Sequence, residues 1–298
     1  MSGSAMLPGM QAKPRVAIVG AGNLGTALAL ALRSAGYAIP AIVSRAKESS
    51  RRRARGLAKQ VSTRIVSELS IVNVEVVWLC VPDSEIAGVA EQLAKSATST
   101  SWKGRVALHA SGALTSEELE PLRARGAAVA SVHPMMTFVK GSRPSLVGVP
   151  FAIEGDAAAV RVARRIVRDL GGRAYAIRKR DKAAYHAWGT FVSPLFTALL
   201  ATSERVASRA GVKRSDAARR AIPILMQTLA NYAQLGPAVG FSGPIVRGDV
   251  ETVRRHLRVL RTVPAAYNAY VALANAALEY LPSRNKAALK RVLSHAAK

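Results

Sequence analysis

A glycine-rich turn between an apolar run and an Ala/Leu-rich segment constrains the fold of this chain more than any other feature. The run Val16–Val19 is rich in β-branched residues, which favours a strand buried on both faces. Residues 20–25 follow with the spacing G-x-G-x-x-G, and Thr26–Ser34 is predicted to be a helix. A second apolar run, Ala38–Val43, completes a βαβ unit.

Each glycine of this turn has a separate structural role. Gly20 makes the tight turn, Gly22 lets a pyrophosphate approach the backbone, and Gly25 lets the helix pack close to the strand. The N–H groups at the helix start, where Asn23 and Leu24 lie, would then face the phosphates, helped by the helix dipole. The segment therefore predicts a dinucleotide site.

The end of the second strand distinguishes the two nicotinamide cofactors. A site that prefers NAD has an acidic residue there to bind the ribose 2′-OH. This chain instead has Ser44 and Arg45, and a hydroxyl and a guanidinium would bind a 2′-phosphate that an acid would repel. We therefore predict NADP(H) as the cofactor. The nearby Arg52 and Arg53 are expected on a solvated helix face.

A further buried strand is predicted over Val74–Val81, and a proline follows it directly. Ligands bind at the carboxyl ends of the strands in open α/β sheets, so Val81 and Pro82 are candidate cofactor contacts. Asp83 is expected to cap the helix predicted over Glu85–Lys95.

Two histidines follow neighbouring predicted strands. His109 comes after Arg105–Leu108, with Ser111 close behind, and His133 comes after Ala127–Val132. A lone histidine is more often structural, but two at the edge where nicotinamide would lie favour a catalytic role. Either histidine could donate a proton as hydride adds to a C=O or C=N bond.

The pattern changes near residue 180, which predicts two domains. A strand, a helix and a strand over residues 151–177 complete a Rossmann domain spanning 14–180, after a flexible leader over residues 1–13. Strand patterns then stop, and long Ala/Leu-rich segments predict a helical domain over 181–298. The expected helices span residues 181–210, 215–235, 249–261, 264–280 and 283–296. The fold class is thus α/β plus all-α.

The first of these helices carries candidate substrate contacts. Tyr185 and His186 lie near its start, and Ser193 precedes Pro194, which should kink it. A kinked helix with polar residues near its bend often lines a cleft, although Tyr185 could equally be a core residue.

A Gly/Pro-rich loop interrupts the helical domain over residues 236–249. So much glycine and proline between two strong helices predicts a shaped loop. Within it, Arg247 could clamp a substrate carboxylate or phosphate, or it could pair with Asp249.

Composition excludes several classes of protein. No apolar stretch in the 298 residues is long enough to span a membrane and no signal peptide is recognised, so a cytoplasmic protein is expected. The single cysteine, Cys80, cannot form an intramolecular disulfide, and no Cys or His pair has zinc-ligand spacing. The formal charge of +25 would attract polyanions, but the basic residues are spread along the chain without a nucleic-acid-binding motif.

Six motifs carry a family resemblance that spans nearly the whole chain. They are VGAGNLGTALA (19–29), VPDSEI (81–86), HASGAL (109–114), SVHPMMTF (131–138), AYHAW (184–188) and GPIVRGD (243–249), which is followed by His256-Leu257. The sequence resembles Rossmann-like proteins with a C-terminal domain of unknown function 2520. These are related to pyrroline-5-carboxylate reductases, ketopantoate reductases and deazaflavin-linked NADP oxidoreductases.

The resemblance implies an NADP-binding Rossmann domain, a helical C-terminal domain and a homodimer formed through the helices. The pair Ser193-Pro194 departs from the expected Ser-Asn and is closer to the Ser-Gly-Pro of pyrroline-5-carboxylate reductases. The Lys-x-x-x-Asn pattern of hydroxyacid dehydrogenases is not recognised, so no lysine acid/base is expected. The family has no settled substrate.

The leading hypothesis is an NADP-dependent oxidoreductase acting on a small carbonyl, imine or hydroxy substrate, with an anionic group that suits Arg247. His133 or His186 would donate the proton, with His109 and Ser111 near the nicotinamide. The alternatives are a non-catalytic NADP sensor or interaction protein and, more weakly, charge-driven nucleic-acid binding.

Overall fold

A computed structural model describes residues 12–44, 48–66, 74–96 and 102–295. Nearly all of the expected leader, and Arg45, lie outside the described residues. The chain divides into two compact units, Met1–Gly189 and Thr190–Lys298. The boundary lies one helix later than residue 180, because the helix that begins at Lys182 buries Lys182 and Tyr185 in the first unit.

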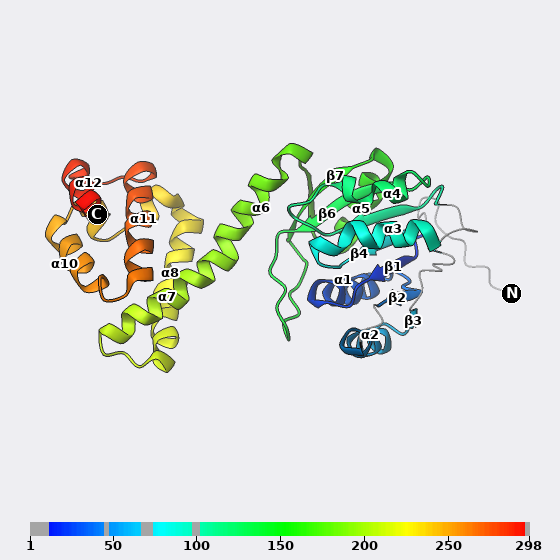
Figure 1. The fold of residues 1–298 in the computed structure, drawn as a ribbon, viewed down its shortest axis with the longest axis horizontal. Helices are drawn as coiled ribbons and strands as arrows, with labels where there is room; N and C mark the ends of the chain where they lie inside the picture. The colour runs from blue at the N-terminus through cyan, green and yellow to red at the C-terminus, as the bar shows by residue number, and fades with distance from the viewer. Residues whose placement is uncertain (1–11, 45–47, 67–73, 97–101, 296–298) are drawn as a thin grey trace, which may run out of the picture. The chain divides into compact units, whose positions relative to one another are not determined.

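The first unit is built on an eight-stranded sheet with the order β3-β2-β1-β4-β5-β6-β7-β8 (Figure 1). The strands are β1 (Val16–Val19), β2 (Ala41–Val43), β3 (Arg64–Val66), β4 (Val76–Leu79), β5 (Val106–His109), β6 (Ala128–Pro134), β7 (Pro150–Gly155) and β8 (Arg173–Ala176). All neighbours are parallel except β6 and β7. The order reverses between β1 and β4, as in doubly wound sheets, so the predicted Rossmann architecture is confirmed.

Helices cover both faces of this sheet. They are α1 (Asn23–Ser34), α2 (Glu48–Gln60), α3 (Ile86–Ser96), α4 (Glu120–Arg123) and α5 (Ala157–Asp169), with short 3₁₀ turns η1 (Asp83–Glu85), η2 (Ser116–Leu119) and η3 (Lys179–Asp181). Helices α1, α2 and α5 pack on the face that includes Trp78, and α3 and α4 on the face that includes Leu79. Because successive strand residues point to opposite faces, these two neighbours on β4 belong to different cores.

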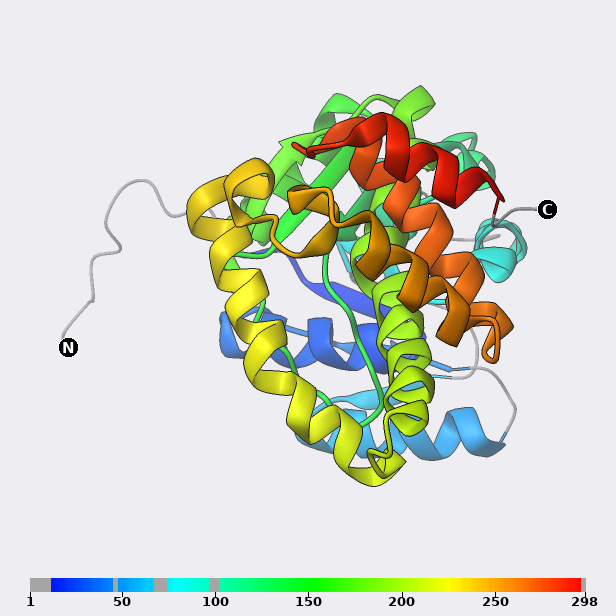
Figure 2. The same cartoon turned by 90° about the vertical axis from the view of Figure 1, so that its left-hand side faces the viewer.

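The unit ends with α6 (Lys182–Thr190), whose last residue opens the second unit. The rest of the second unit contains a π-helical turn η4 (Phe191–Leu195), α7 (Phe196–Arg209), α8 (Arg214–Gly240), α9 (Pro244–Arg247), α10 (Val250–Leu260), α11 (Pro264–Tyr280) and α12 (Lys286–His295). Figure 2 shows α7 and α8 running antiparallel. Val253 and Leu257 of α10 pack with Leu278 and Leu289 of α11 and α12. The all-helical prediction for this region is confirmed.

One local expectation needs correction. The predicted loop over 236–249 is largely helical, because only Gly236 interrupts α8 with φ 75° and α9 follows. Pro194 produces a π-helical turn at the expected irregularity, since a wider turn accommodates its missing N–H. Within the part of the chain that the structure describes, no helix is long and apolar enough to span a bilayer.

Candidate functional site

The glycine loop packs so tightly that two of its residues must lack a Cβ. Gly20 has φ 104°, and a Cβ there would lie 2.5 Å from the Cys80 carbonyl oxygen. A Cβ on Gly25 would lie 2.0 Å from the Gly20 carbonyl oxygen. Gly22 differs, because no atom lies within 4 Å of the corresponding position. The loop therefore presents an open backbone surface at Gly22, where α1 begins.

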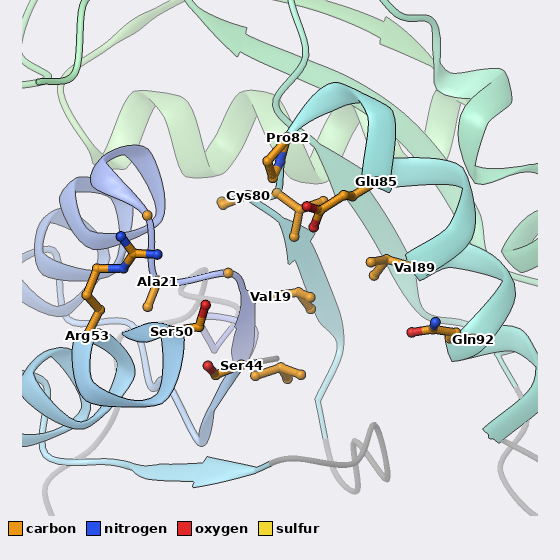
Figure 3. Close-up of a pocket in the computed structure, with 14 residues that line it drawn as sticks. Val19, Ala21, Ser44, Ser50, Arg53, Cys80, Pro82, Glu85, Val89 and Gln92 are labelled. Carbon is orange, nitrogen blue, oxygen red and sulfur yellow. The ribbon is translucent and has the colours of Figure 1, made fainter. Parts of the chain in front are cut away.

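A cavity of about 210 Å³ opens beside this loop, at the carboxyl ends of β1, β2 and β4 (Figure 3). It is lined by Val19, Gly20, Ala21, Gly22, Val43, Ser44, Ser50, Arg53, Cys80, Val81, Pro82, Glu85, Val89 and Gln92. The cavity thus lies where the strand order reverses, the usual ligand position in open α/β sheets. The expected contacts Gly20, Gly22, Ser44, Val81 and Pro82 all line it.

Arg53 is exposed, as expected, and it also lines this cavity. Ser50 and Arg53 are three apart on α2 and therefore share the face that looks toward the strand ends. An adjacent cavity of about 250 Å³, at the start of α1, is lined by Arg53 together with Arg52 and Arg143. The arginines concentrate positive charge beside the glycine loop.

Asn23 and Leu24 have structural side chains. Asn23 Nδ2 donates to the Phe138 carbonyl oxygen at 3.1 Å, and Leu24 packs against the sheet core. Only their backbone groups, at the first turn of α1, are suited to phosphate binding.

His109 and Ser111 form a closed hydrogen-bond arrangement at the end of β5. His109 is fully buried, its Nδ1 accepts from the Ser111 N–H at 3.1 Å, and its Nε2 lies 2.9 Å from the Thr115 carbonyl oxygen. Burial lowers the pKa of His109 to about 4. Because both ring nitrogens are engaged with backbone, His109 holds the loop and has no free nitrogen for a ligand.

Ser111 and Asp83 are also engaged with each other. Ser111 Oγ donates to Asp83 Oδ2 at 2.7 Å and accepts from the N–H groups of Ala113 and Leu114. No side chain caps η1, and the capping of the following helix by Asp83 stays a prediction. The Asp83 carboxylate fastens the loop after β4 to the loop after β5.

His133 forms the centre of a second group, at the end of β6. Its Nδ1 lies 2.8 Å from the hydroxyl oxygen of Tyr185, which is buried on α6. The His186 ring lies 6.3 Å away, edge-on, and is exposed. Burial, with smaller contributions from the Lys182 charge and from His186, lowers the pKa of His133 to about 4. The two histidines thus have opposite environments.

Gly112 was not identified as a site residue from the sequence, although it lies between these rings. A Cβ on Gly112 would lie 2.8 Å from both His133 Nε2 and His186 Cδ2. Nε2 of His133 therefore faces the backbone of the HASGAL segment. The glycine in the HASGAL segment was the one sequence signal that could have indicated this close approach.

Lys182 is a second residue near this site that the sequence analysis does not identify. It is 1% exposed, and its Nζ donates to Ser131 Oγ at 2.6 Å and to the Ser111 carbonyl oxygen at 3.0 Å. Burial lowers its pKa to about 8. Its position in a run of basic residues concealed it, because such runs are usually solvated. Among the described residues, no group of three or more His, Cys, Asp and Glu could hold a metal ion.

The two remaining candidates, Ser193 and Arg247, belong to the second unit. The Ser193 carbonyl oxygen accepts from Thr197 Oγ1 within the π-helical region. Arg247 Nε donates to Asp249 Oδ2 at 2.9 Å, which is the pairing considered from the sequence. A role for either residue in substrate binding stays a prediction.

Two family models together match most of the chain, and they meet within the sheet, between β6 and β7. Residues 4–134 match the Rossmann-like domain, and residues 149–277 match the domain of unknown function DUF2520. The chain is a Rossmann-like protein with a DUF2520 domain. The resemblance inferred from the six motifs is therefore confirmed. A comparison with curated proteins finds no match.

Solved structures share the fold of this DUF2520 protein at low sequence identity. A candidate NADP oxidoreductase from Bacteroides fragilis is 23% identical, with a TM-score of 0.73 over 89% of this chain and 97% of the other. A Thermotoga maritima protein is 23% identical, with a TM-score of 0.67 over 95% and 100%. A reductive aminase from Aspergillus terreus, in complex with NADPH and ethyl-5-oxohexanoate, is 18% identical, with a TM-score of 0.62 over 90% and 94%.

Proposed function

We propose that this DUF2520 protein is an NADP-dependent oxidoreductase that transfers hydride between nicotinamide and a small carbonyl, imine or hydroxy substrate. The observation that carries the proposal is the arrangement along one sheet edge. A glycine-lined cavity with a nearby arginine lies at the ends of β1, β2 and β4, and the His133–Tyr185 pair lies at the end of β6 of the same sheet. The fold shared with a reductive aminase in complex with NADPH supports the same reaction class.

The residues beside the glycine loop fit a dinucleotide. Gly22 leaves open space where any other residue would project a Cβ, and α1 begins directly after it with unpaired N–H groups in its first turn. The bound cofactor would supply the hydride, and the protein would supply position and electrostatics.

We assign recognition of the 2′-phosphate to Ser44, Ser50 and Arg53. All three line the cavity near the end of β2, where the adenosine ribose lies in Rossmann sites. A guanidinium and hydroxyls are suited to a phosphate dianion. This assignment replaces Arg45, which lies outside the described residues, as the main cation.

The opposite environments of the two histidines divide their roles. His133 stays neutral at neutral pH, and the Tyr185 hydroxyl engages its Nδ1. We assign the ring hydrogen to Nε2, with Nδ1 as the acceptor in this contact. His133 would donate a hydrogen bond from Nε2 to the substrate oxygen or nitrogen and polarise the double bond, a role known for neutral histidines in enzymes. His186, whose side chain is exposed, would deliver the proton.

The finer expectations concern the substrate, the assembly and the location. With Arg247 as an anion clamp and Ser193 as a further substrate contact, an anionic substrate stays the working expectation. A homodimer through the second unit is supported by the exposed apolar residues Ile222, Met226 and Leu229 at helical spacing on α8. A cytoplasmic location stays a prediction.

The test is NADPH oxidation by the full chain with pyruvate, 1-pyrroline-2-carboxylate and cyclohexanone plus an amine, each compared with NADH. Turnover of any of them that depends on His133 or His186 supports the proposal. Tight NADPH binding without turnover of the three probes would favour the non-catalytic sensor. Absence of binding to either nucleotide would overturn the proposal.

A further inference from the structure

Lys182 is the only buried lysine or arginine in the described part of the chain. Burying a lysine is costly unless its ammonium group is compensated, so its place at the head of α6 requires an explanation. Its Nζ reaches two oxygens from two different strand ends, Ser131 Oγ on β6 and the Ser111 carbonyl oxygen after β5. Ser131 Oγ in turn donates to the same Ser111 carbonyl at 3.1 Å. The three groups form a closed triangle.

The Lys182–Ser131 contact and the Tyr185–His133 contact follow one another along α6 and β6. Lys182 and Tyr185 are three residues apart and share one face of α6, while Ser131 and His133 are two apart and share one face of β6. Lys182 binds Ser131, and Tyr185 binds His133. The helix is thus attached to the strand at two successive points, the first of which is fully buried.

We propose that Lys182 is a positioning residue that fastens α6 to the ends of β5 and β6 and thereby holds Tyr185 and His133 in contact. The proposal rests on the proposed function only for the catalytic use of that pair. The contact geometry itself is independent of any reaction.

The surroundings of Lys182 connect this position to the protonation of His133. The charged or titratable groups that face the two residues are Asp83 from η1, His109 from β5, Glu154 from β7, and Tyr185 and His186 from α6. The ammonium charge lowers the pKa of His133, whereas Asp83 raises it. Lys182 therefore favours the neutral imidazole in addition to placing its partner.

A nucleophilic role for the Ser131–Lys182 pair does not fit the structure. Ser131 is fully buried, and its hydroxyl hydrogen is donated to the Ser111 carbonyl. A substrate cannot reach the oxygen without displacing β6 from its neighbours. The Ser131–Lys182 contact is therefore structural, and it attaches α6 to β6 next to His133 and Tyr185.

The test compares Lys182→Met with Lys179→Met in the full chain. Methionine keeps the length of lysine without its charge or donors. Lys179 is the matched control, because it lies in the preceding turn and makes an exposed ion pair with Glu117. The first readout is the titration of His133 by NMR with ¹³C-labelled histidine, assigned through His133→Gln. The second is kcat and KM with NADPH and whichever of the three probes the wild type reduces.

In Lys182→Met we expect His133 to titrate at higher pH than in the wild type. We also expect kcat to fall roughly a hundredfold, as for a misplaced catalytic group, with the KM for NADPH unchanged. Lys179→Met should match the wild type in both readouts. An unchanged His133 titration would overturn the proposal, and because it needs no substrate, it separates this failure from failure of the proposed function. If Lys182→Met does not fold, Ser131→Ala, which removes one of the two acceptors, should shift the His133 titration in the same direction, and no shift there would equally overturn it.

Discussion

Tyr185 and His133 meet at 2.8 Å between the hydroxyl oxygen and Nδ1, although they are 52 positions apart in the sequence. The contact joins the first helix after the sheet to the last parallel strand of the doubly wound set. Because the Tyr185 hydroxyl engages Nδ1, Nε2 is the ring nitrogen left for another partner. A helix outside the sheet therefore decides which ring nitrogen of His133 faces the HASGAL segment.

The division of roles between the two histidines predicts different effects of the same substitution. His133→Gln keeps an N–H donor near the position of Nε2 and should retain more activity than His133→Ala, which we expect to lower kcat by about 10²-fold or more. His186→Gln should lower kcat, because it removes the proposed proton donor. The measurement is kcat against pH for the four proteins. Equal kcat in His133→Gln and His133→Ala would contradict the hydrogen-bonding role.

Arg53 should determine the preference for NADPH over NADH. Arg53→Ala removes a charge-assisted contact worth about 2 kcal/mol, so NADPH should bind roughly thirtyfold more weakly while NADH is little affected. Arg55→Ala is the control, because Arg55 is on the same helix and pairs with Glu48 without lining the cavity. Calorimetric titration gives both affinities. If Arg55→Ala weakens NADPH binding as much as Arg53→Ala, the loss of affinity comes from the lower net charge of the protein. The assignment of Arg53 to the 2′-phosphate then fails.

Two glycines of the same loop should respond in opposite ways. Gly25→Ala forces a Cβ to 2.0 Å from the Gly20 carbonyl and should destabilise the fold by about 3 kcal/mol. Gly22→Ala has open space and φ −73°, which alanine adopts, so stability should change by less than about 1 kcal/mol while nucleotide affinity falls. Thermal unfolding with and without NADPH measures both. Unchanged NADPH stabilisation of Gly22→Ala would contradict the proposed backbone approach.

Acid should destabilise the first unit through its buried histidines. His109 and His133 have pKa values of about 4 in the fold against 6.5 ordinarily. Between pH 6.5 and 4 the unfolded chain therefore binds more protons, and stability falls as pH falls, by up to about 3 kcal/mol for each histidine. The melting temperature at pH 7, 5.5 and 4.5 measures the loss. His133→Gln should lose less over this range than the wild type, and an identical loss would mean that His133 is not held neutral.

The apolar stripe on α8 predicts the assembly. Leu229→Glu puts a charge at one end of the stripe formed by the exposed residues Ile222, Met226 and Leu229, and it should reduce the oligomer mass without lowering the stability of the monomer. Analytical ultracentrifugation distinguishes the species. The control is Thr228→Glu, on the same helix and also exposed. A monomeric wild type would contradict a dimer through the second unit.

The sequence predicts most of the fold because its strongest signals are local. The apolar runs, the glycine spacing and the change of period near residue 180 each depend on neighbouring residues, and all of them match the observed elements. The reversed pairing of β6 with β7 has no such signal, because strand direction depends on where the chain travels between strands.

The candidate site is less predictable for the same reason. Strand ends identify His109 and His133, but only the fold reveals that His109 is closed by backbone bonds and His133 is held by Tyr185. Arg53 and Lys182 both lie in basic stretches typical of solvated surfaces. The direction in which Arg53 points depends on the phase of α2, and the burial of Lys182 depends on how α6 packs against the strand ends. Neither can be inferred from neighbouring residues in the sequence.

Cys80 closes the β4 side of the nucleotide cavity, and it is the only thiol in the chain. It is nearly buried, and burial raises the pKa of its thiol to about 12, so it should react slowly with thiol reagents. The rate at which a thiol reagent labels this single sulfur should therefore report how accessible the cavity is. It can be measured in the unaltered chain.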